Sequence, residues 1–439
     1  MHVWLPEAHP AAPSHVSAVM SGVMIKTGIY GLLRALTFLG PPPVWFGWTL
    51  AAIGAASGVL GVLLALAQHD LKRLLAYHSV ENIGIIALGL GLGLVGHATG
   101  NPAMAVLGIA GGLLHVLNHA IFKSLLFLGA GAVLHATGSR NIEKMGGLIK
   151  RMGATGAAFL IGSAAICGLP PLNGFVSEFL IYVGAFGVLA SAPPAGAALA
   201  ASLLAILALS MIGGLAAACF AKAFGIVFLG EPRSEAARGA HEAALGMRLP
   251  MLALAGLCAL IGLAGPLALK AALPAVEVLL PDLPVAQLGG PPRALLWRVS
   301  LGAAALIALA SAAWFVRAWL LRRRVVAQSG TWDCGYAAPS ARMQYTASSF
   351  AAPVLGMFRL ALRPRERLRA PEGLFPPEAQ LHTHQDDMFA RGIYGPLFRA
   401  AAWLAGRFRW LQAGPNQLYV LYIALAILAL LIWKLGWPL

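Results

Sequence analysis

Long apolar runs separated by short polar connections dominate the chain. Each run is about as long as the roughly 20 residues that a helix needs to cross a bilayer. The pattern predicts nine membrane-spanning segments, at about 15–38, 44–67, 80–98, 103–137, 154–192, 197–229, 249–270, 295–321 and 417–435. The fold class that we expect is therefore all-α, a polytopic helical membrane protein.

Two of these runs are longer than one straight span requires. The run at 154–192 contains GLPPLNG at 168–174, where two prolines remove helix donors and the glycines loosen the backbone. We expect a helix that is broken at membrane depth there. The run at 103–137 has no such interruption, so we expect it to be tilted, to protrude or to be locally unwound.

Basic residues alternate from one connection to the next. The basic clusters are Lys72 with Arg73; Arg140, Lys144, Lys150 and Arg151; Arg233, Arg238 and Arg248; and Arg317 with Arg322, Arg323 and Arg324. The connections at 39–43, 99–102 and 193–196 are nearly uncharged. By the positive-inside rule, one orientation puts all four clusters in the cytoplasm. The tail 325–415 is then cytoplasmic, and the last span runs outward.

The tail 325–415 has a different composition, rich in Arg and Pro. Within it, apolar residues recur every three or four positions over 386–411, with arginines between them. This spacing predicts an amphipathic helix along the cytoplasmic membrane surface. A solvated basic linker is the alternative.

The composition agrees with a membrane protein. Of 439 residues, 59% are hydrophobic and 11% are charged, and the mean hydropathy is +0.78. An ordinary soluble domain carries about 25% charged residues. The net charge of +15 lies mostly in short loops, which argues against nucleic-acid binding. The four cysteines, at 167, 219, 258 and 334, form no CxxC pair, so we expect no redox cofactor and no metal on this chain.

Four charged side chains fall inside predicted spans: Lys26, Lys123, Glu178 and Lys222. A charge at the bilayer centre costs at least about 2.5–3.5 kcal/mol, so these residues are candidates for function. Lys26 lies near the middle of its span, and three helical turns separate it from His15, which predicts that both share one face. The alternative for Lys26 is a snorkelling lysine.

His115, His119 and Lys123 follow one another at intervals of four residues, which places three titratable groups on one helical stripe. Imidazole can accept and donate a proton near neutral pH, so this stripe suits a proton relay. A satisfied core histidine is the usual alternative for a single His. A metal site is the other alternative, but Lys123 would repel the cation and a third ligand is missing.

Three further positions complete the set of candidates. Glu178 follows the expected break, close to the N-terminus of the second half-helix, and such gaps are where transporters bind and pass ions. Lys222 lies about two turns from its cytoplasmic loop, where it either functions or snorkels. His78 and Glu81 stand at the start of the third span, as a proton entrance or as an interfacial cluster.

Four stretches resemble a known family. They are HVWLPEAHPAAPSHVSAVMSGVMIKTGIYGLLR at 2–34, LKRLLAYHSVENIG from 71, NHAIFKSLLFLGAGAV from 118 and GLPPLNGFVSEFLI from 168. They resemble the antiporter-like, proton-translocating subunits shared by respiratory complex I, Mrp cation/proton antiporters and membrane-bound hydrogenases. TWDCGY at 331–336 and the long C-terminal extension look most like the hydrogenase-4 and formate-hydrogenlyase branch of that family.

The resemblance implies a role for each matching residue. Lys26 corresponds to the lysine on the last helix of a first half-channel, and Lys123 to the central-axis lysine. His115 and His119 correspond to the relay histidines, and Glu178 to the broken-helix residue of a second half-channel.

The resemblance also divides the chain. Residues 1–43 would end a first antiporter repeat, 44–230 would form the second five-helix repeat, and 231–321 would add two further transmembrane helices. Residues 322–415 would be a cytoplasmic extension, and 416–439 the last transmembrane helix. On this reading most of the first repeat would precede Met1, so we expect an N-terminally truncated subunit.

Together these observations predict a proton-translocating subunit of a hydrogenase-4-like or formate-hydrogenlyase-like complex in a bacterial cell membrane. It would hold no redox centre, and its partners would be other membrane and peripheral subunits, the lipid bilayer and H⁺ or Na⁺, without nucleic acid. A complex I or Mrp antiporter subunit is the alternative within the family. A quinone-binding redox enzyme and a structural membrane scaffold are the alternatives from other classes.

Overall fold

The structure is a computed structural model. It describes residues 2–190 and 196–325, and beyond them 327, 335–336, 340–341, 343–362, 364–370, 373, 380–385, 387–409 and 414–435. Cys334, most of TWDCGY and most of the predicted connection at 193–196 lie outside the described residues. The chain divides into two compact units, Met1–Gln385 and Asp386–Leu439.

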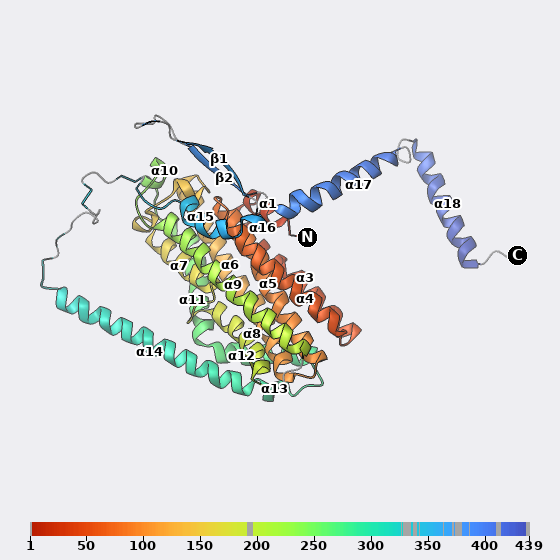
Figure 1. Cartoon of the computed structure of the whole chain (residues 1–439), viewed down its shortest axis with the longest axis horizontal. Coiled ribbons are helices and arrows are strands. Elements are labelled where there is room, and N and C mark those ends of the chain that lie inside the picture. The colour runs from red at the N-terminus through yellow and green to blue at the C-terminus, as the bar shows by residue number, and fades with distance from the viewer. Residues whose placement is uncertain are drawn as a thin grey trace. The chain divides into compact units, whose positions relative to one another are not determined.

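The first unit is a bundle of long helices (Figure 1). These are α1 (Leu5–Ala11), α2 (Ser14–Val19), α3 (Lys26–Leu39), α4 (Val44–Leu66), α5 (Leu71–Ala98), α6 (Pro102–Thr137), α7 (Gly153–Ile166), α8 (Asn173–Leu189), α9 (Gly196–Phe228), α11 (Leu245–Leu263), α12 (Gly265–Leu279) and α14 (Gly290–Leu321). Short elements connect them: η1 (Met20–Met24), η2 (Ile142–Lys144), η3 (Leu148–Lys150), α10 (Glu235–Arg238), α13 (Val285–Leu288), α15 (Ala347–Met357) and α16 (Arg359–Leu362). Strands β1 (Arg365–Arg369) and β2 (Gln380–His384) pair antiparallel.

The predicted all-α membrane fold is confirmed. Among the described residues, eight helices are long and apolar enough to cross a membrane, with α2 to α3 and α13 to α14 each counting as one. The ninth predicted segment is the broken one, since α7 ends at Ile166 and α8 begins at Asn173. The run at 103–137 is one unbroken helix, α6, of 36 residues. At 1.5 Å per residue it is about 54 Å long, so it must tilt or protrude rather than unwind.

Two predicted boundaries are wrong. The third span begins at Leu71 rather than at residue 80, because Asp70 caps α5: its Oδ1 accepts the backbone N–H groups of Lys72 at 2.9 Å and Arg73 at 3.0 Å. The apolar run at 249–270 is not one span, since α11 ends at Leu263 and α12 follows after a turn at Ala264.

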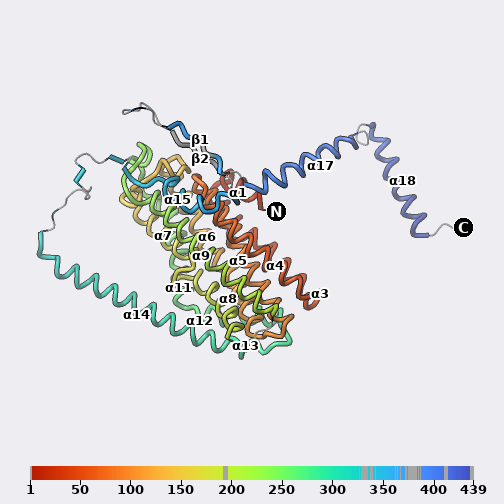
Figure 2. The backbone as a smooth tube through the Cα atoms, viewed as in Figure 1, coloured from red at the N-terminus to blue at the C-terminus, as the bar shows by residue number. Residues whose placement is uncertain are grey.

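Basic connections gather at one end of the bundle, with α1, α10 and α15 (Figures 1 and 2). There Arg140 pairs with Asp70 at 3.0 Å and Lys150 pairs with Glu231 at 2.6 Å. At the other end, the uncharged connection at 40–42 and residues 280–282 line a cavity of about 120 Å³ with His97. For the basic connections after α4, α6 and α9, the alternation of charge along the sequence therefore corresponds to the two ends of the bundle.

The first half of the broken helix is held from the basic end by Glu242. Its carboxylate accepts the Thr155 hydroxyl at 2.6 Å and the Ala154 N–H at 2.8 Å, so it caps the start of α7. Burial by itself raises the pKa of this carboxyl, but the hydrogen bonds from Thr155, Ala243 and Ala154 outweigh burial and hold the pKa below its usual range. Glu242 therefore keeps its charge at neutral pH.

The C-terminal extension begins on the same end. Glu143 accepts hydrogen bonds from the N–H groups of Ala347 at 3.0 Å and Ser348 at 2.8 Å, which caps α15. Gln344 donates to the Glu231 carbonyl oxygen at 2.9 Å, and Arg233 donates to the Tyr345 carbonyl oxygen. These contacts attach residues 344–348 to the ends of α6 and α9.

The second unit contains η4 (Ala390–Tyr394), α17 (Gly395–Arg407) and α18 (Asn416–Leu435). The predicted amphipathic helix is present over 388–407, with a π-helical turn inside it. Its large apolar side chains are exposed: Ile393, Leu397, Phe398, Trp403 and Leu404. The arginines of this helix are exposed as well, so its position along a membrane surface stays a prediction.

Helices α4 and α5 pack backbone against backbone through glycines. A Cβ atom at Gly84 of α5 would lie 2.5 Å from the Gly58 nitrogen and 2.6 Å from the Gly54 oxygen of α4. Backbone atoms cannot move aside as a side chain can, so any side chain at Gly84 forces the two helices apart.

We therefore expect Gly84→Ala to lower the melting temperature of the detergent-solubilised chain, since overpacking costs about 1–3 kcal/mol. Gly213→Ala is the matched control, because a Cβ at Gly213 meets no atom within 4 Å. Thermal unfolding followed by size-exclusion chromatography measures both, and equal melting temperatures would contradict the close-packing account.

Candidate functional site

Most of the predicted titratable residues lie among buried polar side chains inside the bundle, a group that we call the axis. Its fully buried members on α5, α6 and α8 include His78, Glu81, Asn82, His115, Asn118, His119, Lys123 and Ser177. Burying such groups is unfavourable unless they have hydrogen-bond partners or carry a role that requires them. Their concentration in the middle of an otherwise apolar bundle defines the candidate site.

His78 and Glu81 lie deeper than the sequence indicated. Both have 0% exposed area, because α5 begins at Leu71 and places them in its second and third turns. His78 Nδ1 and Glu81 Oε2 are directly hydrogen bonded. The pair therefore lies inside the bundle with the other buried polar residues and not on its surface.

A chain of side-chain hydrogen bonds crosses from α5 through α6 to α8. Asn82 Nδ2 lies 3.3 Å from Glu81 Oε2, and Asn82 Oδ1 lies 3.0 Å from His115 Nε2. His115 Nδ1 lies 2.9 Å from Ser177 Oγ, which also accepts the Asn118 amide at 3.0 Å. Three helices are thus connected through side chains that can donate or accept hydrogen bonds.

His119 and Lys123 continue the stripe on α6. No described residue is a hydrogen-bond partner of the Lys123 ammonium or of either His119 ring nitrogen. Lys123 interacts electrostatically with Glu81 and Lys26, and its Nζ atom lies 5.8 Å from the Phe127 ring centroid. Buried polar atoms without protein partners are the groups that bind internal water, which a proton path also needs.

Lys26 reaches this cluster because its helix contains a π-helical turn. In η1 the Ile25 N–H donates to the Met20 carbonyl at 3.2 Å, five residues back, and Lys26 Nζ donates to the Ser21 carbonyl oxygen. The Ser21 and Ser79 hydroxyls are 2.7 Å apart, which connects this turn to α5. π-turns inside helices are frequent at functional sites.

The same π-turn overturns one prediction. His15 is exposed, whereas Lys26 is buried, so the two do not share a face. A π-turn adds one residue to the helix and rotates everything after it, so a spacing counted on a regular α-helix fails across it.

Glu178 lies at the helix break, in the second turn of α8. Its carboxylate packs on Gly168, where a Cβ atom would be 2.7 Å from Glu178 Oε2. Gly168 also has φ +63°, a conformation that residues with a Cβ adopt only with strain. Glycine is therefore required at this position for two reasons, the backbone conformation and the contact with Glu178. The predicted association of Glu178 with the break is confirmed.

Lys222 does not snorkel, since none of its surface is exposed. Its Nζ atom donates to the Leu66 carbonyl at 2.6 Å and to the Gln68 carbonyl at 2.8 Å. These are carbonyls at and just beyond the end of α4, where a cation is favoured by the helix dipole. Lys222 therefore donates hydrogen bonds to the end of α4, a contact that the sequence did not indicate.

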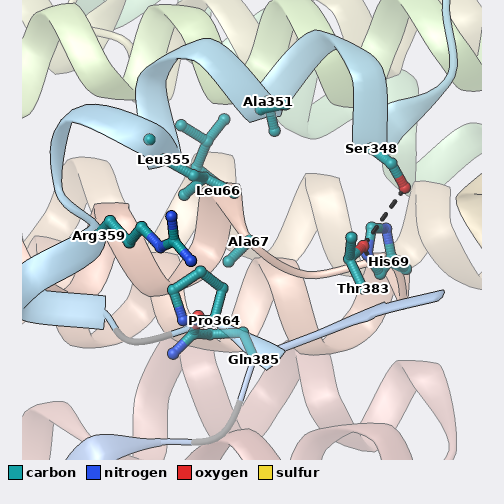
Figure 3. A pocket seen from close by; sticks show the side chains of 12 residues that line it. Leu66, Ala67, His69, Ser348, Ala351, Leu355, Arg359, Pro364, Thr383 and Gln385 are labelled. Carbon is teal, nitrogen blue, oxygen red and sulfur yellow. Dashed lines mark hydrogen bonds between the residues drawn. The ribbon is translucent and has the colours of Figure 1, made fainter. Parts of the chain in front are cut away.

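A cavity of about 160 Å³ lies beside this end of α4, between loop 67–69 and the C-terminal extension (Figure 3). Its walls include Leu66, Arg359 and Gln385, and His69 Nε2 lies 2.8 Å from Thr383 Oγ1. None of the axis residues lines it.

Several axis residues escaped the sequence analysis. Asn82, Asn118 and Ser177 are uncharged, so an analysis based on charges in apolar runs passes over them. His9 of α1 is also buried, with its ring centroid 4.8 Å from that of Phe127. Burial first, and then the charge of Lys123, lowers the pKa of His9 to about 4. Only its position in the sequence HVWLPEAHP could have directed attention to it.

A metal site at the two histidines is disfavoured. Both ring nitrogens of His115 already have hydrogen-bond partners, Asn82 and Ser177, so a cation would have to displace one of them. Among the residues that the structure describes, no group of three or more His, Cys, Asp or Glu side chains lies close enough to hold a metal.

The class of protein follows from this geometry: a polytopic membrane subunit with a broken helix beside a buried Lys/His/Glu axis, as in antiporter-like subunits. The family model described as "NADH:quinone oxidoreductase/Mrp antiporter, TM" matches residues 1–193. An uncharacterised Mycobacterium tuberculosis protein is 40% identical over 449 residues, which cover 98% of this chain and 69% of that protein. The chain therefore belongs to the family of NADH:quinone oxidoreductase and Mrp antiporter membrane subunits.

Two relatives from Escherichia coli have descriptive names. Hydrogenase-4 component B is 40% identical over 446 residues and formate hydrogenlyase subunit 3 is 40% identical over 378. The matches cover 98% and 86% of this chain, but the chain spans only 66% and 60% of the length of those relatives. Both names are those of components of multisubunit complexes.

Solved structures support the same fold. A chain of an archaeal respiratory complex, the membrane-bound sulfane sulfur reductase, matches with a TM-score of 0.66 and 23% identity, over 98% of this chain and 65% of its own. A chain of the Mrp complex from a Dietzia species matches with a TM-score of 0.52 and 24% identity, over 67% and 56%. At such identities the likeness concerns the fold alone.

The contact between Gly168 and Glu178 leads to a prediction. Gly168→Ala should displace the Glu178 carboxylate in addition to straining the backbone by about 1–2 kcal/mol. Gly138→Ala is a matched control, because Gly138 has φ +64° but no atom within 4 Å of its added Cβ. We expect both variants to lose similar stability, measured by thermal unfolding, and Gly168→Ala alone to slow proton uptake in vesicles. Equal proton uptake in the two variants would show that the contact is unimportant.

Proposed function

We propose that this chain is the proton-translocating membrane subunit of a respiratory complex related to hydrogenase-4 and formate hydrogenlyase. Redox chemistry on partner subunits would drive the transfer, and this chain would supply the path through the membrane. The single observation that carries the proposal is the concentration of fully buried titratable side chains, His78, Glu81, His115, His119 and Lys123, on the neighbouring helices α5 and α6. The names of the Escherichia coli relatives support the type of complex.

Each titratable residue has a role in this proposal. His78 and Glu81 receive protons, Lys123 holds them midway with His119 and His115 as its relay, and Glu178 exchanges them at the helix break. Lys26 sits beside the Ser21–Ser79 contact, where its charge acts on the same axis. Lys222 belongs to the set that we first considered, but its contacts with the end of α4 favour a supporting role.

Proton transfer accounts for the site better than the rival functions do. A structural scaffold gains nothing from Lys123, which has no described hydrogen-bond partner and incurs a large desolvation cost. Proton transfer, in contrast, requires a group that carries and releases a proton at this position, which accounts for a lysine there despite the desolvation cost.

Lys123 should be the most sensitive position. Lys123→Ala removes the proton carrier, and Lys123→Arg keeps a charge that cannot be released, because the pKa of arginine exceeds about 12. We expect both to lower proton uptake by about tenfold or more, since a positioned proton-transfer group contributes roughly 10²–10⁴ in rate. Glu178→Gln should act likewise. The assay is proton uptake into everted vesicles that contain the assembled complex.

Lys270→Arg is the control for these variants, because Lys270 is an exposed residue of α12 outside the axis. It should pump like the wild type. Wild-type proton uptake in Lys123→Arg, with the complex assembled, would mean that this lysine is structural and that the proposed function is wrong.

The proposal includes an orientation: the basic end of the bundle and the tail 325–415 face the cytoplasm. Cys334 is a native reporter in this tail, and the described cysteines, Cys167, Cys219 and Cys258, are all buried. A membrane-impermeant maleimide should label Cys334 in inside-out vesicles and not in right-side-out ones. Ala98→Cys, at the uncharged end of α5, should show the opposite pattern. Labelling of Cys334 in right-side-out vesicles would show that the tail faces outward and that the proposed orientation is wrong.

A further inference from the structure

Among the residues that the structure describes, Asn82 is the side chain that joins the two halves of the hydrogen-bonded chain. On one side, its amide nitrogen lies 3.3 Å from Glu81 Oε2, which is paired with His78. On the other side, its amide oxygen lies 3.0 Å from His115 Nε2, and His115 is bonded to Ser177. No water-exposed surface remains on Asn82.

We propose that Asn82 is a proton barrier that separates the His78–Glu81 pair from the His115–Ser177 pair and so directs protons through Lys123. This inference rests on the proposed function and adds to it a residue that blocks a short circuit. It is a positioning residue, because it carries no proton itself.

The orientation of the Asn82 amide follows from its neighbours. Its nitrogen lies 2.7 Å from the His78 carbonyl oxygen, which can only accept a hydrogen bond. Rotating the amide by half a turn would set its own oxygen against that carbonyl. The nitrogen must therefore face His78 and Glu81, and the oxygen must face His115.

This orientation determines the tautomer of His115. The Asn82 oxygen only accepts, so His115 Nε2 must carry the hydrogen and donate it. In the neutral ring Nδ1 is then the acceptor, so the Ser177 hydroxyl at 2.9 Å donates to it in competition with the Gly174 carbonyl oxygen, which lies 3.0 Å from the same hydroxyl. His115 is thus held with its proton directed at a group that cannot take it.

An amide is a poor link in a proton chain for a chemical reason. A hydroxyl, an imidazole or a carboxyl accepts a proton on one lone pair and releases one from the same group. The Asn82 amide would have to pass through its imidic acid form, with a proton on oxygen and one lost from nitrogen, which its ordinary chemistry does not supply. Glu81 and His115 are therefore close in space but not connected for proton transfer.

Lys123 offers the route around the barrier. It lies on α6 two turns beyond His115 and interacts electrostatically with Glu81. Its ammonium has no hydrogen-bond partner among the described residues, so hydrogen bonding to other side chains does not hold it in place. A barrier at Asn82 makes transfer between the halves depend on the state of this lysine, which a coupled pump requires.

The test replaces the barrier by a group that relays protons. Asn82→Asp puts a titratable carboxyl between Glu81 and His115, and Asn82→His puts a neutral relay there. In vesicles with the assembled complex and no redox substrate, we expect passive proton conductance to rise by about tenfold or more, because proton-transfer groups change rates by roughly 10²–10⁴. The rise should persist when Lys123→Ala is added, since the new path bypasses the lysine.

Two controls define the position. Ser202→Asp places a carboxyl at a fully buried position of α9, outside the axis, and should leave passive conductance at the wild-type level. Asn82→Gln keeps an amide, so its passive proton conductance should also remain at the wild-type level. Co-purification of the partner subunits checks that each variant assembles.

The outcomes separate this inference from the proposed function. Suppose that Lys123→Ala abolishes pumping but neither Asn82→Asp nor Asn82→His raises passive proton conductance. The proposed proton path then stands, and the proposal that Asn82 is a barrier fails. A leak of equal size in Ser202→Asp would also overturn the barrier, since any buried carboxyl would then suffice. If Lys123→Ala pumps like the wild type, the proposed function itself fails.

Discussion

The cost of keeping ionisable groups in a low-dielectric interior is the constraint on which the rest of this structure depends. Glu81, Lys123 and Glu178 lie in a bundle whose other interior residues are mostly apolar. Each such charge costs several kcal/mol unless neighbours compensate for it. In this bundle the compensating neighbours are opposite charges, Asn and Ser side chains, and backbone carbonyls freed at a π-turn and at a helix break.

Close helix packing makes that arrangement possible. The glycines of α4 and α5 bring two backbones into contact, and Gly61 approaches the backbone of Glu81 so closely that a Cβ would lie 2.7 Å from its nitrogen. α5 is consequently held against α4 on one face while its polar face turns to α6 and α8. The polar chain is short because the helices are near one another, and it stays buried for the same reason.

The two helix irregularities serve the polar axis in different ways. The π-turn of η1 orients Lys26 inward and lets it bond a backbone carbonyl in its own helix. The break between α7 and α8 places Glu178 against Gly168, whose left-handed backbone conformation only glycine adopts without strain. Outside the membrane region, Glu242 and Glu143 accept backbone N–H groups at the starts of α7 and α15, so carboxylates at the basic end cap two helices.

Much of this protein was determined by the sequence alone. The nine apolar runs, the break at GLPPLNG, the spacing of His115 and Lys123, and the alternation of basic connections are all one-dimensional patterns that a bilayer enforces through length, hydropathy and charge. The tertiary structure decided what local spacing does not contain. The start of α5 at Leu71 buried His78 and Glu81, the π-turn separated His15 from Lys26, and the end of α4 took Lys222 as a structural partner. Asn82 acquired its place only because α5 and α6 meet there, since an uncharged amide carries no signal in a sequence until its neighbours in space are known.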